Sequence, residues 1–118
     1  MREGDVVLTP IPQANGLIKN RPVVCLREML PYKDMLVCGV STQLHQRMKG
    51  FDETITSADA DFKQSGLLAD SLIRLGFLAV LPRKKVIGSI GAISVERRGR
   101  LLKTLSAHLT ANVSGHTP

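Results

Sequence analysis

Polar and cationic side chains stand at the ends of two predicted strands, where a ligand can reach them. Arg21 comes before Pro22 and an apolar run, and Ser41, Thr42 and Gln43 close the next apolar run. If the two strands are antiparallel neighbours, the start of one lies beside the end of the other. We therefore expect Arg21 and Ser41 to meet at one rim of the sheet, flanked by loops, where binding residues are often found.

The charge balance bears on what such a rim binds. Sixteen Lys+Arg against 10 Asp+Glu give a net charge of +6. This favours a polyanionic partner, nucleic acid or an acidic peptide, although a basic protein without such a partner has the same composition. Aromatic residues make up only 3%, so phosphate contacts would have to carry more of any RNA binding than base stacking. The basic runs Arg83-Lys84-Lys85 and Arg97-Arg98 are expected to be solvated surface.

Several other chemistries lack their motifs. His45, His108 and His116 are far apart and show no metal-ligand spacing. The chain contains no GxxxxGK[ST] or GxGxxG phosphate loop and no GxSxG nucleophile motif. Cys25 and Cys38 lie in apolar runs, which predicts buried free thiols. A metalloenzyme or a nucleotide hydrolase is therefore not favoured.

The elements that must position the polar rim are short strands. Apolar runs predict strands at Val6–Leu8, Arg21–Leu26, Met35–Ser41, Phe51–Ile55 and Leu72–Leu75, the last continued or followed by Leu78–Leu81. Pro, Asn, Gly and polar residues predict loops or turns at 10–16, 31–34 and 42–50, whereas 57–65 has no strong pattern. Gly88 and Gly91 predict a break before the last element.

That last element is predicted to be a helix from about Ala92 to Leu109. Val95, Leu102, Leu105 and Leu109 share one face at helical spacing, which predicts core or dimer packing. Short strands followed by one helix predict a mainly β fold with a C-terminal α-helix, either a small β-barrel or a strongly bent sheet.

The length of 118 residues suits one domain. We expect it to span residues 1–110, with a polar tail at 111–118. No apolar run reaches the roughly 18 residues of a membrane span, and the N-terminus lacks the apolar region of a signal peptide. These features predict a cytoplasmic protein without a membrane partner.

Five segments in order resemble the MazF/PemK toxins of type II toxin–antitoxin systems: "GDVVLTPIP", "NRPVVCL", "VSTQL", "GLLADSLIRL" and "IGSIGAISVERRGRLLKTLSAHL". The resemblance implies a small SH3-like β-barrel of the PemK/CcdB type that forms a homodimer. It implies a metal-independent, cofactor-free mRNA interferase that cuts single-stranded RNA at specific sequences. The implied partner is an antitoxin whose disordered acidic segment covers the RNA groove.

The implied reaction is attack of a ribose 2′-hydroxyl on the adjacent phosphate, which leaves 2′,3′-cyclic phosphate and 5′-hydroxyl ends. Arg21 matches the family arginine that binds the added negative charge, a task that suits a guanidinium. Ser41 replaces a threonine and keeps its hydroxyl. Arg74 matches an arginine that one branch of the family uses as a second cation.

Residues beside these three are expected to contact RNA: Lys19, Asn20, Thr42, Gln43 and His45. Each catalytic candidate also has a structural interpretation. Arg21 suits a surface ion pair at the sheet edge, Ser41 a strand-end hydroxyl that bonds the backbone, and Arg74 the solvated face of a strand.

The general base has no clear match. Gly76 stands where one branch of the family has an aspartate, and residues 16–20 hold no acid where another branch has one. His45 is a possible substitute, since an ordinary histidine has a pKa of about 6.5, and is otherwise a solvated loop residue. Two other functions therefore stay open. One is a non-catalytic relative that binds nucleic acid or poisons DNA gyrase, and the other is a small-barrel binding module without a toxin role.

Overall fold

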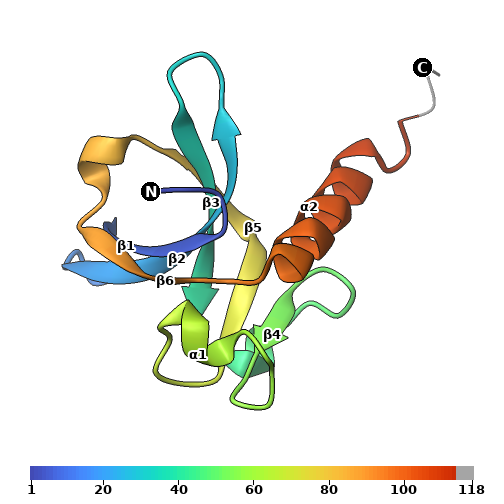
Figure 1. Cartoon of the computed structure of the whole chain (residues 1–118), viewed down its shortest axis with the longest axis horizontal. Coiled ribbons are helices and arrows are strands. Elements are labelled where there is room, and N and C mark those ends of the chain that lie inside the picture. Colours follow the sequence, from blue (N-terminus) through green and yellow to red (C-terminus); the bar gives the residue numbers. More distant parts are fainter. Residues whose placement is uncertain (114–118) are drawn as a thin grey trace.

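One antiparallel six-stranded sheet, strongly curled into a half-barrel, forms the protein, and a C-terminal helix packs against it (Figure 1). The computed structural model describes residues 1–113, so His116 and most of the predicted tail lie outside the described residues. The strand order is β4-β5-β3-β2-β1-β6. The strands are β1 (Asp5–Pro12), β2 (Ile18–Met29), β3 (Asp34–Ser41), β4 (Glu53–Ile55), β5 (Ser71–Leu81) and β6 (Gly88–Ala92). The helices are η1 (Leu44–Gln46), α1 (Phe62–Ser65), η2 (Arg83–Lys85) and α2 (Val95–Thr110).

The predicted mainly β fold with a terminal helix is confirmed. The predicted strand Leu72–Leu81 is one element, β5, and the predicted loop at 42–50 contains only the short turn η1. None of the helices in the described part of the chain combines the length and apolarity that crossing a membrane requires.

Both faces of the sheet are buried at the middle of β2, which explains the unbroken apolar run there. Successive residues of this strand point to opposite faces. Val24 and Leu26 belong to a cluster that includes residues of α2, whereas Val23 and Cys25 belong to a second cluster on the other side. A strand covered on both faces has no solvated side to fill with polar residues.

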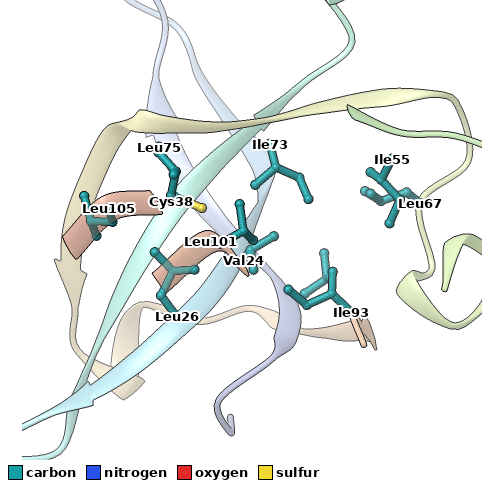
Figure 2. Close-up of a cluster of buried hydrophobic side chains, with 11 residues drawn as sticks. Val24, Leu26, Cys38, Ile55, Leu67, Ile73, Leu75, Ile93, Leu101 and Leu105 are labelled. Atoms are coloured by element: carbon teal, nitrogen blue, oxygen red, sulfur yellow. The ribbon is translucent and has the colours of Figure 1, made fainter. Parts of the chain in front are cut away.

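The larger cluster joins the sheet to α2. Figure 2 shows Leu101 and Leu105 of α2 beside Leu26, Cys38 and Leu75 of three strands. All five side chains are buried. Burial of such side chains is the main favourable term in folding, so α2 is an integral part of the core.

The buried face of α2 differs from the predicted one. Val95 is 77% exposed and Leu109 is 64% exposed, while Leu101, which the predicted stripe omits, is fully buried. Leu102 packs at the margin of the cluster and Leu105 lies inside it. The buried residues of α2 are Arg97, Leu101 and Leu105, at intervals of four. A search for apolar residues at helical spacing does not find this row, because its first member is an arginine.

Arg97 corrects the expectation of a solvated basic run. Its side chain is 5% exposed, and its Nε and Nη2 atoms donate to the two carboxylate oxygens of Asp61 at 2.8 and 3.0 Å. Nη1 donates to Glu53 at 2.9 Å and to the carbonyl of Thr54 at 3.0 Å. Burial opposes ionisation of Asp61, but hydrogen bonds from Arg97 and Ser94 outweigh it and lower the pKa of Asp61 to about 2. The cluster fixes the start of α2 to β4 and to the segment before α1.

Arg98 also departs from the expectation of a solvated run, whereas the other basic run follows it. Arg98 is half-buried and donates to the carbonyl of Leu26 at 3.1 Å. The side chains of Arg83, Lys84 and Lys85 are exposed, as predicted.

The predicted break at Gly88 and Gly91 is wrong, because both glycines lie in β6, which pairs with β1. Gly91 lies against the end of α1, and a Cβ atom on Gly91 or on Gly66 would collide with backbone atoms of the other segment. Gly66 has a φ of +76°, which also favours glycine. The contact lets α1 lie against the edge strand β6, so glycine there serves a close backbone approach.

Cys25 and Cys38 are buried free thiols, as predicted. Burial raises the pKa of each thiol to about 12. Both are therefore protonated near neutral pH and poor nucleophiles.

Candidate functional site

Arg21 lies inside a strand and not in front of one. β2 begins at Ile18, and Arg21 pairs with Thr9 of β1. Toward β3, the ladder begins only at Val23. Arg21 therefore has a strand neighbour on one side, and its exposed side chain lies at the rim beyond the end of the β2–β3 ladder.

A pocket of about 290 Å³ brings the three catalytic candidates together. Arg21, Ser41 and Arg74 all line it, and so do Thr42 and Gln43. These residues come from β2, from β5 and from the end of β3 with the loop that follows it. The predicted meeting of Arg21 and Ser41 at one rim is thus observed, and we call this cavity the Arg21 pocket.

A bulge in β5 accompanies the position of Arg74. Gly39 of β3 pairs with Arg74, but its neighbour Cys38 pairs with Leu78, so residues 75–77 have no partner in β3. Such bulges redirect side chains and are frequent next to functional sites.

Two contacts hold the bulge in place. The buried carboxylate of Asp52 accepts hydrogen bonds from the backbone N–H of Leu75 at 3.2 Å and of Met48 at 2.9 Å. Phe77 lies across Gly39, where an added Cβ atom would be 2.8 Å from its Cδ1 atom. Phe77 also lines the Arg21 pocket, so glycine at position 39 makes room for one wall of the site.

Gln13 orients Arg21, and sequence reasoning missed it. The Nη2 atom of Arg21 donates to the Oε1 atom of Gln13 at 2.7 Å. Gln13 in turn donates from Nε2 to the carbonyl of Ile11 at 2.9 Å, which fixes the direction of its amide. The register of β1 against β2 is the signal that could have identified Gln13. Because Thr9 pairs with Arg21, the residues that follow β1 lie alongside the residues that precede Arg21.

Ser41 is held by a local hydrogen bond. Its Oγ atom accepts from the backbone N–H of Gln43 at 3.0 Å. The hydroxyl proton is then a donor that can be directed elsewhere. Both interpretations of Ser41 thus coexist, because a strand-end hydroxyl bonded to the backbone also lines the pocket.

Three of the expected RNA contacts lie outside the Arg21 pocket. Lys19 and Asn20 are exposed residues of β2 that pair with Ile11 and Pro10. His45 is exposed on η1. The sequence places all three near Arg21, but none of them lines the pocket.

The Arg21 pocket is lined by cationic and polar side chains together with apolar ones. Within residues 1–113 no Asp, Glu or His side chain lines it. No group of three or more His, Cys, Asp or Glu residues in this part of the chain is placed to hold a metal ion. The arrangement suits binding of an anion by two guanidinium groups, with hydroxyl and amide donors beside them.

A second pocket, of about 500 Å³, adjoins the first. The two share five lining residues: Arg21, Pro22, Val40, Ser41 and Thr42. Its remaining walls come from β1, β6 and the segment between α1 and β5, and they are mostly apolar. We call it the apolar pocket.

A search of the curated proteins found none that matches this chain. Residues 2–109 match the model of a family described as PemK-like, MazF-like toxins of type II toxin–antitoxin systems. The match spans the whole sheet, the Arg21 pocket and nearly all of α2. The chain therefore belongs to the PemK-like, MazF-like toxin family.

Proposed function

We propose that this toxin is an endoribonuclease that cuts single-stranded RNA at specific sequences in the Arg21 pocket, without a metal ion or another cofactor. One observation carries the proposal: Arg21 and Arg74 line one open pocket together with the hydroxyl of Ser41, and no carboxylate lines it within residues 1–113. Guanidinium groups that no carboxylate neutralises are suited to bind a phosphate from outside the chain.

The reaction needs groups that stabilise charge on the phosphate. The 2′-oxygen forms a bond to phosphorus, and the bond from phosphorus to the 5′-oxygen of the next nucleotide breaks. The 2′-hydroxyl loses its proton and the leaving 5′-oxygen gains one. Products are a 2′,3′-cyclic phosphate and a 5′-hydroxyl. Extra negative charge develops on the phosphate oxygens, where Arg21 and Arg74 donate hydrogen bonds.

The neighbouring groups would hold the substrate. Gln13, which also lines the pocket, keeps Arg21 in place, and a fixed donor loses less free energy to reorganisation than a mobile one. Ser41 has a hydroxyl proton to direct at a phosphate oxygen. Thr42 and Gln43 line the same pocket and add donors along the RNA backbone.

Proton transfer is not assigned to a residue of this pocket. His45 remains the candidate base from the sequence, and it would have to reach the reacting atoms from η1. The proposal therefore assigns charge stabilisation to Arg21 and Arg74 and leaves His45 to a separate test.

Membership of a toxin–antitoxin family implies an antitoxin partner. We propose that an acidic, disordered segment of the antitoxin covers the Arg21 pocket, because carboxylates would pair with the same guanidinium groups that bind phosphate. We further propose that the toxin is a cytoplasmic homodimer, and that Lys19 and Asn20 contact the RNA beyond the pocket.

One observation favours a second candidate function. Since no Asp, Glu or His lines the pocket within residues 1–113, the chain would also suit a relative that binds nucleic acid or poisons DNA gyrase without cutting RNA. The two candidates differ in whether a covalent bond is broken.

The decisive experiment incubates the purified toxin with a long single-stranded RNA in EDTA and maps the cut sites by primer extension. We expect discrete cuts whose 5′-hydroxyl ends accept labelled phosphate directly from polynucleotide kinase. Arg21→Ala should lower the cleavage rate by roughly 100-fold or more, as loss of a transition-state donor does. Arg27→Ala, an exposed arginine on the same strand, is the matched control and should cut normally.

Three results would count against the proposal. If Arg21→Ala cleaves RNA at the normal rate, the assigned role of Arg21 is wrong. If cleavage stops in EDTA, the metal-independent mechanism is wrong. If the wild-type toxin cuts no RNA but inhibits DNA supercoiling by gyrase, the second candidate function replaces the first.

A further inference from the structure

The apolar pocket contains the most exposed large hydrophobic side chain of the described chain. Leu68, between α1 and β5, is 100% exposed. Leu67 of the same segment and Ile90 of β6 line the pocket with it. Single exposed leucines are common on protein surfaces, but one that borders a concave apolar cavity is a feature of binding sites.

This pocket is continuous with the site of the proposed reaction. Arg21, Ser41 and Thr42 line both cavities. The Arg21 pocket extends from these shared residues toward Arg74, and the apolar pocket extends from them toward α1 and β6. A phosphate bound by Arg21 would therefore lie at the boundary between a cationic cavity and an apolar one.

The apolar pocket offers few hydrogen bonds to a ligand. The hydroxyl of Ser71, one of its polar lining residues, donates to the carbonyl of Ala69 at 2.7 Å. The walls are otherwise formed mainly by aliphatic side chains and by Gly66. A flat, largely apolar group that carries its charge at one end would match this pocket and its arginine rim.

We propose that the apolar pocket holds the base of a nucleotide directly next to the phosphate that is cut, an inference that rests on the proposed ribonuclease function. Leu68 and Ile90 contact the faces and edges of that base. Recognition at this position is by size and shape, because the walls have few free donors and acceptors. Such pockets discriminate modestly, on the order of tenfold to 200-fold for a small change of size.

The rim favours a nucleotide over a second copy of the chain. A protein surface that covered the pocket would also cover Arg21, whose recorded hydrogen bond goes to the neutral amide of Gln13. Removing an unneutralised guanidinium from water is costly unless an anion accompanies it. A nucleotide provides the apolar base and the phosphate together.

The test uses Leu68→Ala and Leu68→Phe in the full-length toxin. Leu30→Ala, a control on the β2–β3 hairpin, removes a leucine that is 86% exposed and does not line the pocket. The substrates are short single-stranded RNAs that vary the base on each side of the mapped cut site. We expect Leu68→Ala to raise KM about tenfold and to weaken the preference at one adjacent base, with kcat within about twofold of wild type. Leu68→Phe should shift that preference toward the smaller base.

A second measurement keeps this inference separate from the ribonuclease assignment. Binding is measured by fluorescence anisotropy with the same RNAs carrying a 2′-deoxy nucleotide at the cut position, which removes the attacking hydroxyl. We expect Leu68→Ala to weaken this binding by the same factor as KM and Leu30→Ala to leave it unchanged. If the wild-type toxin cuts no RNA, the proposed function fails, and this binding comparison still tests the pocket.

Two results would overturn the inference. One is unchanged binding and unchanged base preference in both Leu68 variants while wild-type toxin binds RNA. The other is dissociation of a wild-type oligomer into monomers by Leu68→Ala, measured by sedimentation, because the pocket would then be an interface between copies of the chain.

Discussion

Arg21 and Arg97 are the same side chain in two regions with opposite environments. Arg97 is 5% exposed and contacts the carboxylates of Asp61 and Glu53. Arg21 is exposed, and the hydrogen bond recorded for it goes to the neutral amide of Gln13. The positive charge of Arg97 is neutralised inside the protein, whereas no carboxylate of residues 1–113 forms an ion pair with Arg21. The comparison teaches that the partners of an arginine, more than its sequence context, separate a structural role from a ligand-binding one.

Replacement of Arg97 should have the largest effect on stability. Arg97→Ala leaves the buried carboxylate of Asp61 without its cation, whereas Glu53 keeps its ion pair with Arg100. We expect a loss of about 3–5 kcal/mol in the free energy of unfolding, as for other broken buried ion pairs. Urea unfolding followed by circular dichroism measures it. A loss below 1 kcal/mol would mean that the cluster does not anchor α2, and Arg27→Ala is the exposed control.

The second-largest expected effect is a loss of stability in acid, through the partner of Arg97, Asp61. The pKa of Asp61 is about 2 in the folded protein against an ordinary value of 3.8. The folded state therefore binds fewer protons, so this contribution is complete above about pH 4 and is lost as pH falls through 2. The difference corresponds to about 2 kcal/mol.

Urea unfolding at pH 7, 4 and 2.5 measures this acid dependence. In Asp61→Asn the carboxyl group is gone, so stability should fall less steeply with pH between 4 and 2.5 than in the wild type. Equal slopes for the two proteins would show that Asp61 does not contribute to the acid sensitivity.

Arg21→Lys should have a smaller effect, and this effect should distinguish the role of Arg21 from that of Arg97. Lysine keeps the charge but loses the planar fork that binds two oxygens at once. We expect RNA cleavage to fall by roughly tenfold, about 1.4 kcal/mol in the activation free energy. The free energy of unfolding should change by less than about 0.5 kcal/mol, as for surface substitutions. The same conservative change at Arg97 should instead reduce stability, and a stability loss in Arg21→Lys would break the comparison.

The smallest effect is expected from His45. It is exposed on η1 and does not line the Arg21 pocket. If charge stabilisation by Arg21 and Arg74 dominates, His45→Gln should change the cleavage rate by less than about threefold and keep the shape of its pH profile. Loss of a pH-dependent limb in the variant would instead identify His45 as the general base.

The strands and the helix that depend on local sequence could be predicted from the residue pattern of a single segment. The apolar runs located five of the six strands and the terminal helix. β6 was missed because Gly88 and Gly91 resemble a break. Glycine at position 91 is required by a contact with α1, more than 20 residues away. The buried face of α2 was missed because Arg97 takes an apolar position by pairing with acids of another segment.

The candidate site shows the same limit. Arg21 and Ser41 were expected to meet because antiparallel neighbours bring the ends of their strands together, and one pocket includes both. Gln13 and Phe77 were not found, since one acts through the β1–β2 register and the other through a bulge in β5. Neither feature leaves a periodic signal in the sequence.

The pairing of β1 with β6 also affects how the toxin is made. Residues 5–8 of the first strand pair with residues 88–92 of the last, and the core includes Leu101 and Leu105 of α2. A chain still under synthesis therefore has an open β1 edge and an incomplete core until nearly all of it has been translated. Contacts between such distant segments also make folding slow. The Arg21 pocket, whose lining residues end at Phe77, therefore rests on a core that only these later residues complete.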